Sequence, residues 1–130
     1  MREILFRGKR LDNGNWIHGL LWRKIDNDEK IYISRFPLKV NEEKADPVDP
    51  DTVGQYTGLQ DKNGVKIFEG DIVAFDAYSQ HFIGVVTIEN GNTDVRCKNA
   101  SPFLDDVIYK RDGEVLGNIY DNPELLKQID

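Results

Sequence analysis

The sequence is poor in the residues from which most catalytic and metal sites are built. Its 130 residues contain one cysteine, Cys97, and two histidines, His18 and His81. A single cysteine cannot form an internal disulfide, and these three side chains do not make a zinc site without carboxylates. The aspartates of residues 46–51 match neither the ligand spacing nor the glycine of an EF-hand calcium loop. We therefore expect no metal and no cofactor, and we expect Cys97 to be a half-buried strand residue.

Long apolar runs and known catalytic motifs are also absent. No segment approaches the ~20 apolar residues that a membrane-spanning helix needs, and residues 1–8 lack the apolar core of a signal peptide. The sequence has no phosphate-binding glycine loop, no zinc-hydrolase helix motif and no serine-hydrolase elbow. It therefore predicts a cytoplasmic protein that enters no membrane and is not an enzyme.

The composition describes a folded protein with an uneven charge. Apolar residues make up 39% and charged residues 31%, which is typical of a globular chain. A chain of this length forms one compact domain that buries about two-thirds of its unfolded surface. The net charge is −6, but residues 1–24 carry six basic and two acidic side chains. The acidic excess disfavours nucleic acid, although screening over ~8 Å lets a local basic segment act by itself.

Four turn signals indicate a mainly β fold. Asn-Gly and Asp-Gly pairs tolerate the positive φ values of two-residue hairpin turns, and they occur in residues 12–14, 62–64, 89–91 and 111–113. Short β-branched or aromatic runs predict strands at residues 2–7, 15–22, 30–34, 71–77, 82–89, 93–98 and 114–120. One clear helix signal is present, where Asn122 precedes Pro123.

These elements group into lobes of a single domain. We expect an N-terminal β-hairpin unit at residues 1–40, an acidic, proline-broken connection at 41–51, a small barrel at 52–121 and a short C-terminal helix at 122–129. In that helix Leu125 and Leu126 are expected to face inward. In the hairpin unit a two-residue turn at Asn13 and Gly14 would pair Arg10 with Ile17 and Arg7 with Leu20.

One carboxylate pair is a candidate for acid–base chemistry. Glu69 and Asp71 flank Gly70 at the start of a predicted strand, and with His81 they would form a site if the three side chains lay within hydrogen-bonding reach. The favoured alternative is structural, because carboxylates beside a glycine also cap the amides of a turn. The same role is expected for Asp49 and Asp51 around Pro50.

A basic, tryptophan-containing hairpin is the candidate binding surface. Basic and aromatic side chains alternate here in a way that could track a nucleic-acid strand, and the candidate contacts are Arg7, Lys9, Arg10, Trp22 and Arg23. The simpler alternative is an ordinary hairpin with its charges in solvent and its tryptophans in the core. A third is that this basic lobe meets the acidic remainder of another copy, which would give a homo-oligomer.

Four segments, in order, resemble the YopX family of phage and prophage proteins: residues 1–8, 48–56, 56–75 and 115–126. The signature residues, which we expect to be structural, are Tyr56, Gly58, Leu59, Asn63, Gly64, Glu69, Gly70, Asp71, Gly117, Asn118, Ile119 and Pro123. The resemblance implies an SH3-like barrel at residues 52–121, whereas the strand pattern alone leaves an OB topology open. It implies no established biochemical activity, so any activity particular to this chain is expected in residues 24–47 and 77–112.

Together these observations predict a non-enzymatic accessory protein that acts in the cytoplasm of a bacterial host. It is expected to bind another protein, either as a homo-oligomer or with a host or phage protein. The alternative is a nucleic-acid-associated module that uses the basic hairpin. Replacing Arg7, Lys9 and Arg10 by glutamine should weaken only the second activity.

Overall fold

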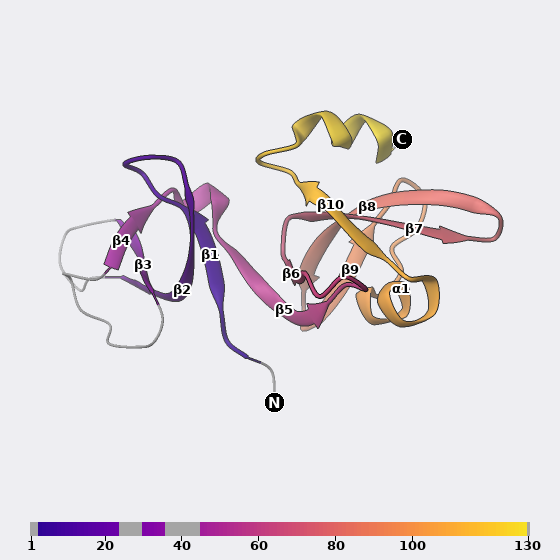
Figure 1. Ribbon diagram of the computed structural model, residues 1–130, viewed down its shortest axis with the longest axis horizontal. Coiled ribbons are helices and arrows are strands. Elements are labelled where there is room, and N and C mark those ends of the chain that lie inside the picture. Colours follow the sequence, from indigo (N-terminus) through magenta and orange to yellow (C-terminus); the bar gives the residue numbers. More distant parts are fainter. Residues whose placement is uncertain (1–2, 24–29, 36–44, 130) are drawn as a thin grey trace. The chain divides into compact units, whose positions relative to one another are not determined.

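The computed structural model describes residues 3–23, 30–35 and 45–129. It divides into two compact units, Met1–Tyr56 and Thr57–Asp130. Both are built mainly from antiparallel strands, which confirms the mainly β fold class (Figure 1).

Unit 1 is a curled antiparallel sheet. Its strands lie in the order β4-β3-β2-β1-β5, and a short 3-10 turn, η2 (Pro50–Thr52), leads into the last strand. The strands are β1 (Phe6–Lys9), β2 (Trp16–Arg23), β3 (Ile31–Arg35), β4 (Ala45–Val48) and β5 (Gly54–Gln60). The start of β5 returns to pair with β1, and its end continues into unit 2.

The sheet of unit 1 closes on itself next to β1. Arg10 forms a bridge with Val48, and the Leu11 N–H donates to the Pro47 carbonyl over 3.0 Å. The closure encloses a small core of Ile17, Ile33 and Val48. Strand β4 thus gains partners on both sides, and its edge is not left open.

The register of the first hairpin differs from the expected one. Strand β1 pairs Arg7 with His18 and Lys9 with Trp16, so the predicted pairing of Arg7 with Leu20 is wrong. The turn is longer than two residues because the Arg10 N–H bonds the Asn15 carbonyl and the Asn13 side chain accepts the Asn15 N–H. The side chain of Asn13 therefore shapes this turn.

Unit 2 contains a four-stranded antiparallel sheet with strand order β10-β7-β8-β9. Strand β6 pairs instead with β5. The elements are β6 (Lys66–Phe68), β7 (Asp71–Ala77), β8 (Gln80–Glu89), β9 (Asn92–Arg96), α1 (Leu104–Arg111), β10 (Glu114–Asn118) and η3 (Pro123–Ile129). The four-stranded sheet carries the candidate site described below.

Each face of this sheet is covered by one helix (Figure 1). Residues Val73, Phe75 and Ala77 of β7 join a core with Leu104, Val107 and Ile108 of α1. The alternate residues Ile72 and Ala74 face the other way, against Leu125 and Ile129 of η3. Alternation along β7 thus buries both faces, which accounts for its nearly continuous apolar sequence.

Three expectations about local structure are corrected. The expected hairpin at residues 111–113 is wrong, because these residues end helix α1, which the sequence did not predict. Residues 45–48 of the expected connection form β4, whereas 41–44 lie outside the described residues. The C-terminal helix is a 3-10 helix, and its Leu126 is 41% exposed and does not face inward. The SH3-like topology expected for residues 52–121 stays a prediction.

Candidate functional site

The basic hairpin residues are engaged within unit 1. The guanidinium carbon of Arg7 lies 4.7 Å from the centroid of the Trp16 ring, and Arg7 is only 8% exposed. Lys9 lies over the same ring at 5.4 Å. Arg10 pairs with Asp12 at 2.6 Å and with Asp46 at 3.4 Å. The hydrogen bond to Asp12 is the main cause that raises the pKa of Arg10 above its ordinary value; burial opposes it, and the charges of Asp46 and Asp12 add to the rise.

Trp22 is also held by its neighbours. Its ring stacks on Tyr32 with centroids 4.9 Å apart, and its Nε1–H donates to the Ser34 hydroxyl over 3.0 Å. Arg23, the last residue of β2, is exposed. The five candidate contacts for nucleic acid therefore share a strand pair, but most of their polar and aromatic groups already have internal partners.

Several signature residues hold turns together. Asn63 and Gly64 lie in the turn between β5 and β6, and Gly64 has a φ of 80°. Asp61, outside the signature, organises this turn by accepting the N–H groups of Asn63 at 2.9 Å and Val65 at 3.0 Å. Its second oxygen accepts the Val115 N–H of β10 at 3.0 Å, so one buried carboxylate joins two segments of unit 2.

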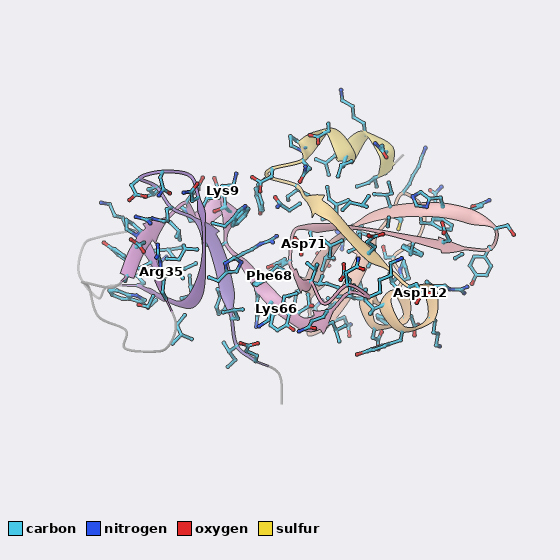
Figure 2. All side chains as sticks on the ribbon, in the orientation of Figure 1. Lys9, Arg35, Lys66, Phe68, Asp71 and Asp112 are labelled. Carbon is cyan, nitrogen blue, oxygen red and sulfur yellow. The ribbon has the colours of Figure 1, made fainter. Side chains whose placement is uncertain are left out.

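The signature residues around β7 serve the entry into that strand. Asp71, 2% exposed, accepts the Phe68 N–H at 2.8 Å, and the two residues lie side by side in Figure 2. Gly70 has a φ of 92°, donates to Val86 and accepts from Ile119. These bonds correspond to the turn-capping alternative for Asp71.

The closing signature is a compact network. Asn118 accepts the N–H groups of Tyr120 at 3.0 Å and Asp121 at 2.9 Å. A Cβ added at Gly117 would overlap the Asn122 side chain, which itself bonds the Asn118 N–H. The remaining signature residues lie at other points of the fold: Tyr56 is buried, Gly58 has a φ of 89°, Leu59 and Ile119 border the cores, Glu69 precedes Gly70 and Pro123 begins η3.

The structure does not bring the proposed acid–base residues together. His81 pairs in register with Asp76 near the far end of β7, and its Nδ1 lies 2.8 Å from the Asp76 carboxylate. Asp71 is the first residue of β7, about 16 Å from Asp76 at the ordinary rise of a strand. A site that needs Glu69, Asp71 and His81 in mutual contact is therefore ruled out.

A groove of about 430 Å³ crosses the α1 face of the sheet at the outer end of the β7–β8 hairpin. We call it the aromatic groove; its lining is Phe75, Ala77, Tyr78, Phe82, Ala100, Ser101, Pro102, Asp106, Val107, Lys110 and Arg111. Its walls come from the end of β7, the hairpin turn, the start of β8, the loop after β9 and helix α1.

The tip of the hairpin presents an exposed aromatic side chain to this groove. Tyr78 and Ser79 form the two-residue turn, and both have positive φ, at 53° and 62°. Tyr78 is 82% exposed, and the Arg111 guanidinium lies 5.1 Å from its ring centroid. Below it, Phe75 and Phe82 stack at 5.3 Å. Two non-glycine residues in the left-handed conformation lower the stability of this turn. Strained backbone of this kind recurs at functional sites.

A second hollow, of about 220 Å³, adjoins the aromatic groove and shares Phe82 and Ala100 with it. We call it the edge pocket; its lining is Gln80, His81, Phe82, Ile83, Cys97, Lys98, Asn99, Ala100, Gln128 and Ile129. Burial raises the pKa of the Cys97 thiol above its ordinary value. This is the opposite of the shift that activates a nucleophilic cysteine.

Sequence reasoning missed both hollows. Their lining comes from β7, β8, the loop after β9, α1 and η3, so only the folded chain assembles it. Most of the aromatic groove nevertheless lies within residues 77–112, the region expected to carry any activity particular to this chain. The available signal was the short gap between the strands predicted at residues 71–77 and 82–89, which contains Tyr78 and Ser79, although neither residue favours positive φ.

The described residues contain neither a cluster suited to a metal ion nor a helix suited to a membrane span. In residues 3–23, 30–35 and 45–129, no group of three or more histidine, cysteine, aspartate or glutamate side chains could hold a metal ion. None of the helices in these ranges combines the length and the apolar character that a membrane span requires.

Comparison with known proteins places the chain in a family. A family model described as YopX protein matches residues 5–127. The chain belongs to the YopX family. A solved structure, described as the crystal structure of protein EF1440 from Enterococcus faecalis, is similar to this YopX-family chain at 26% identity and a TM-score of 0.65. The match covers 97% of this chain and 99% of that one. No curated protein matches, and neither description names an activity.

Proposed function

We propose that this YopX-family protein is a non-enzymatic binding module that recognises another protein through the aromatic groove. The observation that carries the proposal is the exposed Tyr78 at a strained hairpin tip, above a hollow walled by Phe75 and Phe82. Aromatic side chains next to arginine are typical of residues that dominate protein interfaces. The hollow also has the size and apolar character of a pocket for a partner's side chain.

The setting we propose is the cytoplasm of a bacterium that carries a phage or prophage. There the protein acts as an accessory factor, and its partner is a host protein, a phage protein or a second copy of the chain. An uneven charge supports association with proteins, since residues 1–24 carry a basic excess in a chain of net charge −6.

The alternative of a nucleic-acid module has less support. Arg7 is buried against Trp16, Arg10 pairs with two aspartates, and Trp22 stacks on Tyr32. Recruiting these groups to phosphates or bases would break contacts that hold unit 1 together. We therefore interpret these hairpin residues as structural and not as an open binding surface.

A pull-down with matched variants tests the protein-binding proposal. Tagged wild type, Tyr78→Ala and Tyr109→Ala are incubated with nuclease-treated bacterial lysate, and bound proteins are identified by mass spectrometry. Tyr109 is the control because it is a 73% exposed tyrosine of α1 that does not line the groove. We expect Tyr78→Ala alone to lose the captured protein. Equal capture by all three, or no protein captured by any of them, contradicts the proposal.

Self-association is measured on the same variants. Light scattering of the purified chains gives their mass as a function of concentration. If the partner is a second copy, wild type and Tyr109→Ala form oligomers and Tyr78→Ala does not. An oligomer that Tyr78→Ala leaves intact assigns self-association to a different surface.

A further inference from the structure

We propose that the open edge of β8 takes up an extended segment of the partner as an additional β-strand. One apolar side chain of this segment enters the aromatic groove, and acidic side chains lie near Lys98 and Lys110. This inference deepens the proposed function and rests on it. It specifies a polypeptide in strand conformation as the bound species, and it makes backbone hydrogen bonds its main recognition element.

The open edge follows from the unequal lengths of neighbouring strands. Strand β8 begins at Gln80, but its partner β9 ends at Arg96, which pairs with Val85. Beyond Arg96 the chain turns back, with the Cys97 N–H donating to the Ala100 carbonyl and the Val95 N–H to the Pro102 carbonyl. Within the part of the chain that the structure describes, no strand pairs with the outer side of residues 80–84.

The pairing pattern shows which backbone groups point to that edge. Gln80 and Ala77 flank the two-residue Tyr78-Ser79 turn, so the even-numbered residues of β8 bond to β7. Glu89 and Asn92 flank the two-residue turn at the other end, so the odd-numbered residues bond toward β9. His81 and Ile83 are odd-numbered, and their N–H and C=O groups therefore face the open side. The edge offers two donors and two acceptors.

This alternation identifies the bound species as a polypeptide. Donors and acceptors that repeat along one line at the spacing of a strand are complementary to another extended backbone. Base edges and sugar phosphates do not reproduce that repeat. Unprotected edges of this kind pair readily with other chains, and proteins ordinarily cover or charge them.

The two hollows lie where side chains of an added strand would point. Phe82 lies on the α1 face, whereas Ile83 packs on the η3 face against Ile129. An added strand would send alternate side chains to these two faces. On the α1 face they reach the aromatic groove, with Phe82 and Tyr78 in its lining.

Basic side chains around the hollows favour an acidic segment. Lys98 lines the edge pocket, and Lys110 and Arg111 line the aromatic groove, where Asp106 is the one carboxylate in the lining. Lys110 lies 3.4 Å from Asp106, and both side chains are more than half exposed. The lining thus has a local basic excess on an acidic protein, which complements carboxylates of the segment.

The experiment uses peptides selected by the protein itself. A displayed library of random peptides is panned against the immobilised full chain, and an enriched peptide is synthesised with a single N-methyl group at each position in turn. N-methylation at each of two positions that lie two residues apart should weaken binding about tenfold or more, and methylation of the residue between them should not, because only alternate N–H groups of an added strand face β8 and the open edge has two acceptors. Enriched sequences should combine an aromatic or branched apolar residue with flanking carboxylates.

Two variants of one exposed position test the same bonds from the protein side. His81→Pro removes the outward N–H and leaves the pairing with β7 intact, as proline on an edge strand does. His81→Ala keeps the N–H and removes the same side chain. We expect His81→Pro to bind the peptide at least about tenfold more weakly than His81→Ala does, because only the proline variant lacks the outward N–H.

The outcomes separate this inference from the proposed function. Alternating sensitivity to N-methylation supports the added strand, and it is measured on wild-type protein even if His81→Pro does not fold. Binding that is equally sensitive, or equally insensitive, at every position overturns it, as does a library that yields no enriched peptide. If lysate capture still depends on Tyr78 in that case, the proposed function stands without the added strand.

Discussion

Asp61 joins two segments of unit 2 through backbone hydrogen bonds. Its carboxylate accepts three backbone N–H groups, two from the β5–β6 turn and one from Val115 in β10. Burial alone would raise the pKa of Asp61, but the hydrogen bonds from Val115, Val65 and Asn63, with the charge of Lys62, lower it below 3.8 overall. Such a group stabilises the fold when it is ionised.

The first prediction concerns Asp61→Asn. The amide offers one acceptor oxygen in place of two, so we expect a loss of about 1–3 kcal/mol in the free energy of unfolding at neutral pH. Because the folded-state pKa is depressed, the contribution is fully present above about pH 4 and is lost as the pH falls through the folded pKa. Urea denaturation between pH 7 and about pH 2.5 measures both effects.

Asp105→Asn is the control for this prediction. Asp105 is an exposed carboxylate in the first turn of α1, and its change should cost less than about 1 kcal/mol. The variant Asp61→Asn should also show a shallower fall in stability with acid than wild type. Equal stability of the two variants at pH 7 would contradict the role assigned to Asp61.

The second prediction concerns the strained turn at Tyr78 and Ser79. Ser79→Gly should stabilise the protein by about 1 kcal/mol, because glycine adopts positive φ without the steric cost that serine has at 62°. Ser79→Ala serves as the control and should not stabilise. Thermal unfolding measures both, and partner capture by Ser79→Gly should stay unchanged because Tyr78 is retained.

The third prediction separates stability from function at the neighbouring residue. Tyr78→Asn should stabilise the turn, since asparagine favours the left-handed region, and should abolish partner capture. Thermal unfolding and the lysate pull-down measure the two properties on one variant. A variant that is both more stable and fully active would show that the strain at Tyr78 serves no binding role.

At the scale of elements, helix α1 determines where the aromatic groove lies. The helix ends where Asp112 adopts a φ of 51° and the Gly113 N–H bonds the Val107 carbonyl. The sequence signal at Asp112 and Gly113 did mark a residue of positive φ, which is Asp112, but this residue ends a helix instead of joining two strands (Figure 2).

The fourth prediction tests this helix end. A Cβ at residue 113 would lie 2.6 Å from Val107 Cγ1, so Gly113→Ala should destabilise unit 2 by about 1–3 kcal/mol. Asp112→Asn is the control, because asparagine tolerates the same φ. Urea denaturation distinguishes them, and a Gly113→Ala protein as stable as wild type would contradict the close packing of this turn.

The sequence predicts strands better than the helix for a physical reason. Residues 71–77 were predicted as a strand and form β7, because a continuous β-branched and apolar run fits a strand buried on both faces. Residues 104–111 contain Val107, Ile108 and Tyr109, which favour strands, whereas Leu104, Val107 and Ile108 have helical spacing and are buried. Tertiary packing decides between these two signals.

At the scale of the whole molecule, the charge distribution of the sequence predicted the binding surface less well than the contacts that the charged side chains make in the folded chain. The basic excess of residues 1–24 suggested a nucleic-acid surface, yet Arg7 and Arg10 contact Trp16 and two aspartates. Asp46 is distant in sequence, so no local pattern could reveal this pairing. The hydrogen bond from the Val115 N–H to Asp61 also joins residues far apart in the sequence, so no local pattern could predict it. The bond from the Asn63 N–H to Asp61 is local, and an aspartate two residues before the donor is typical of an Asx turn.

The fifth prediction follows from this assignment. A double variant, Lys9→Gln with Arg10→Gln, should capture the same protein from lysate as wild type does, and it should gain or lose no nucleic acid. The pull-down without nuclease, at low and moderate salt, measures both. A salt-sensitive loss of nucleic acid in this variant would restore the alternative function.

Hydrogen exchange with and without the captured partner tests the central claim most directly. Amide exchange across the full chain, read by mass spectrometry, reports which segments the partner protects. We predict protection at residues 77–84 and 98–111, around the hairpin tip and the aromatic groove, with no change in β1 and β2. Protection confined to residues 6–23 would contradict the account and return the binding surface to the basic hairpin.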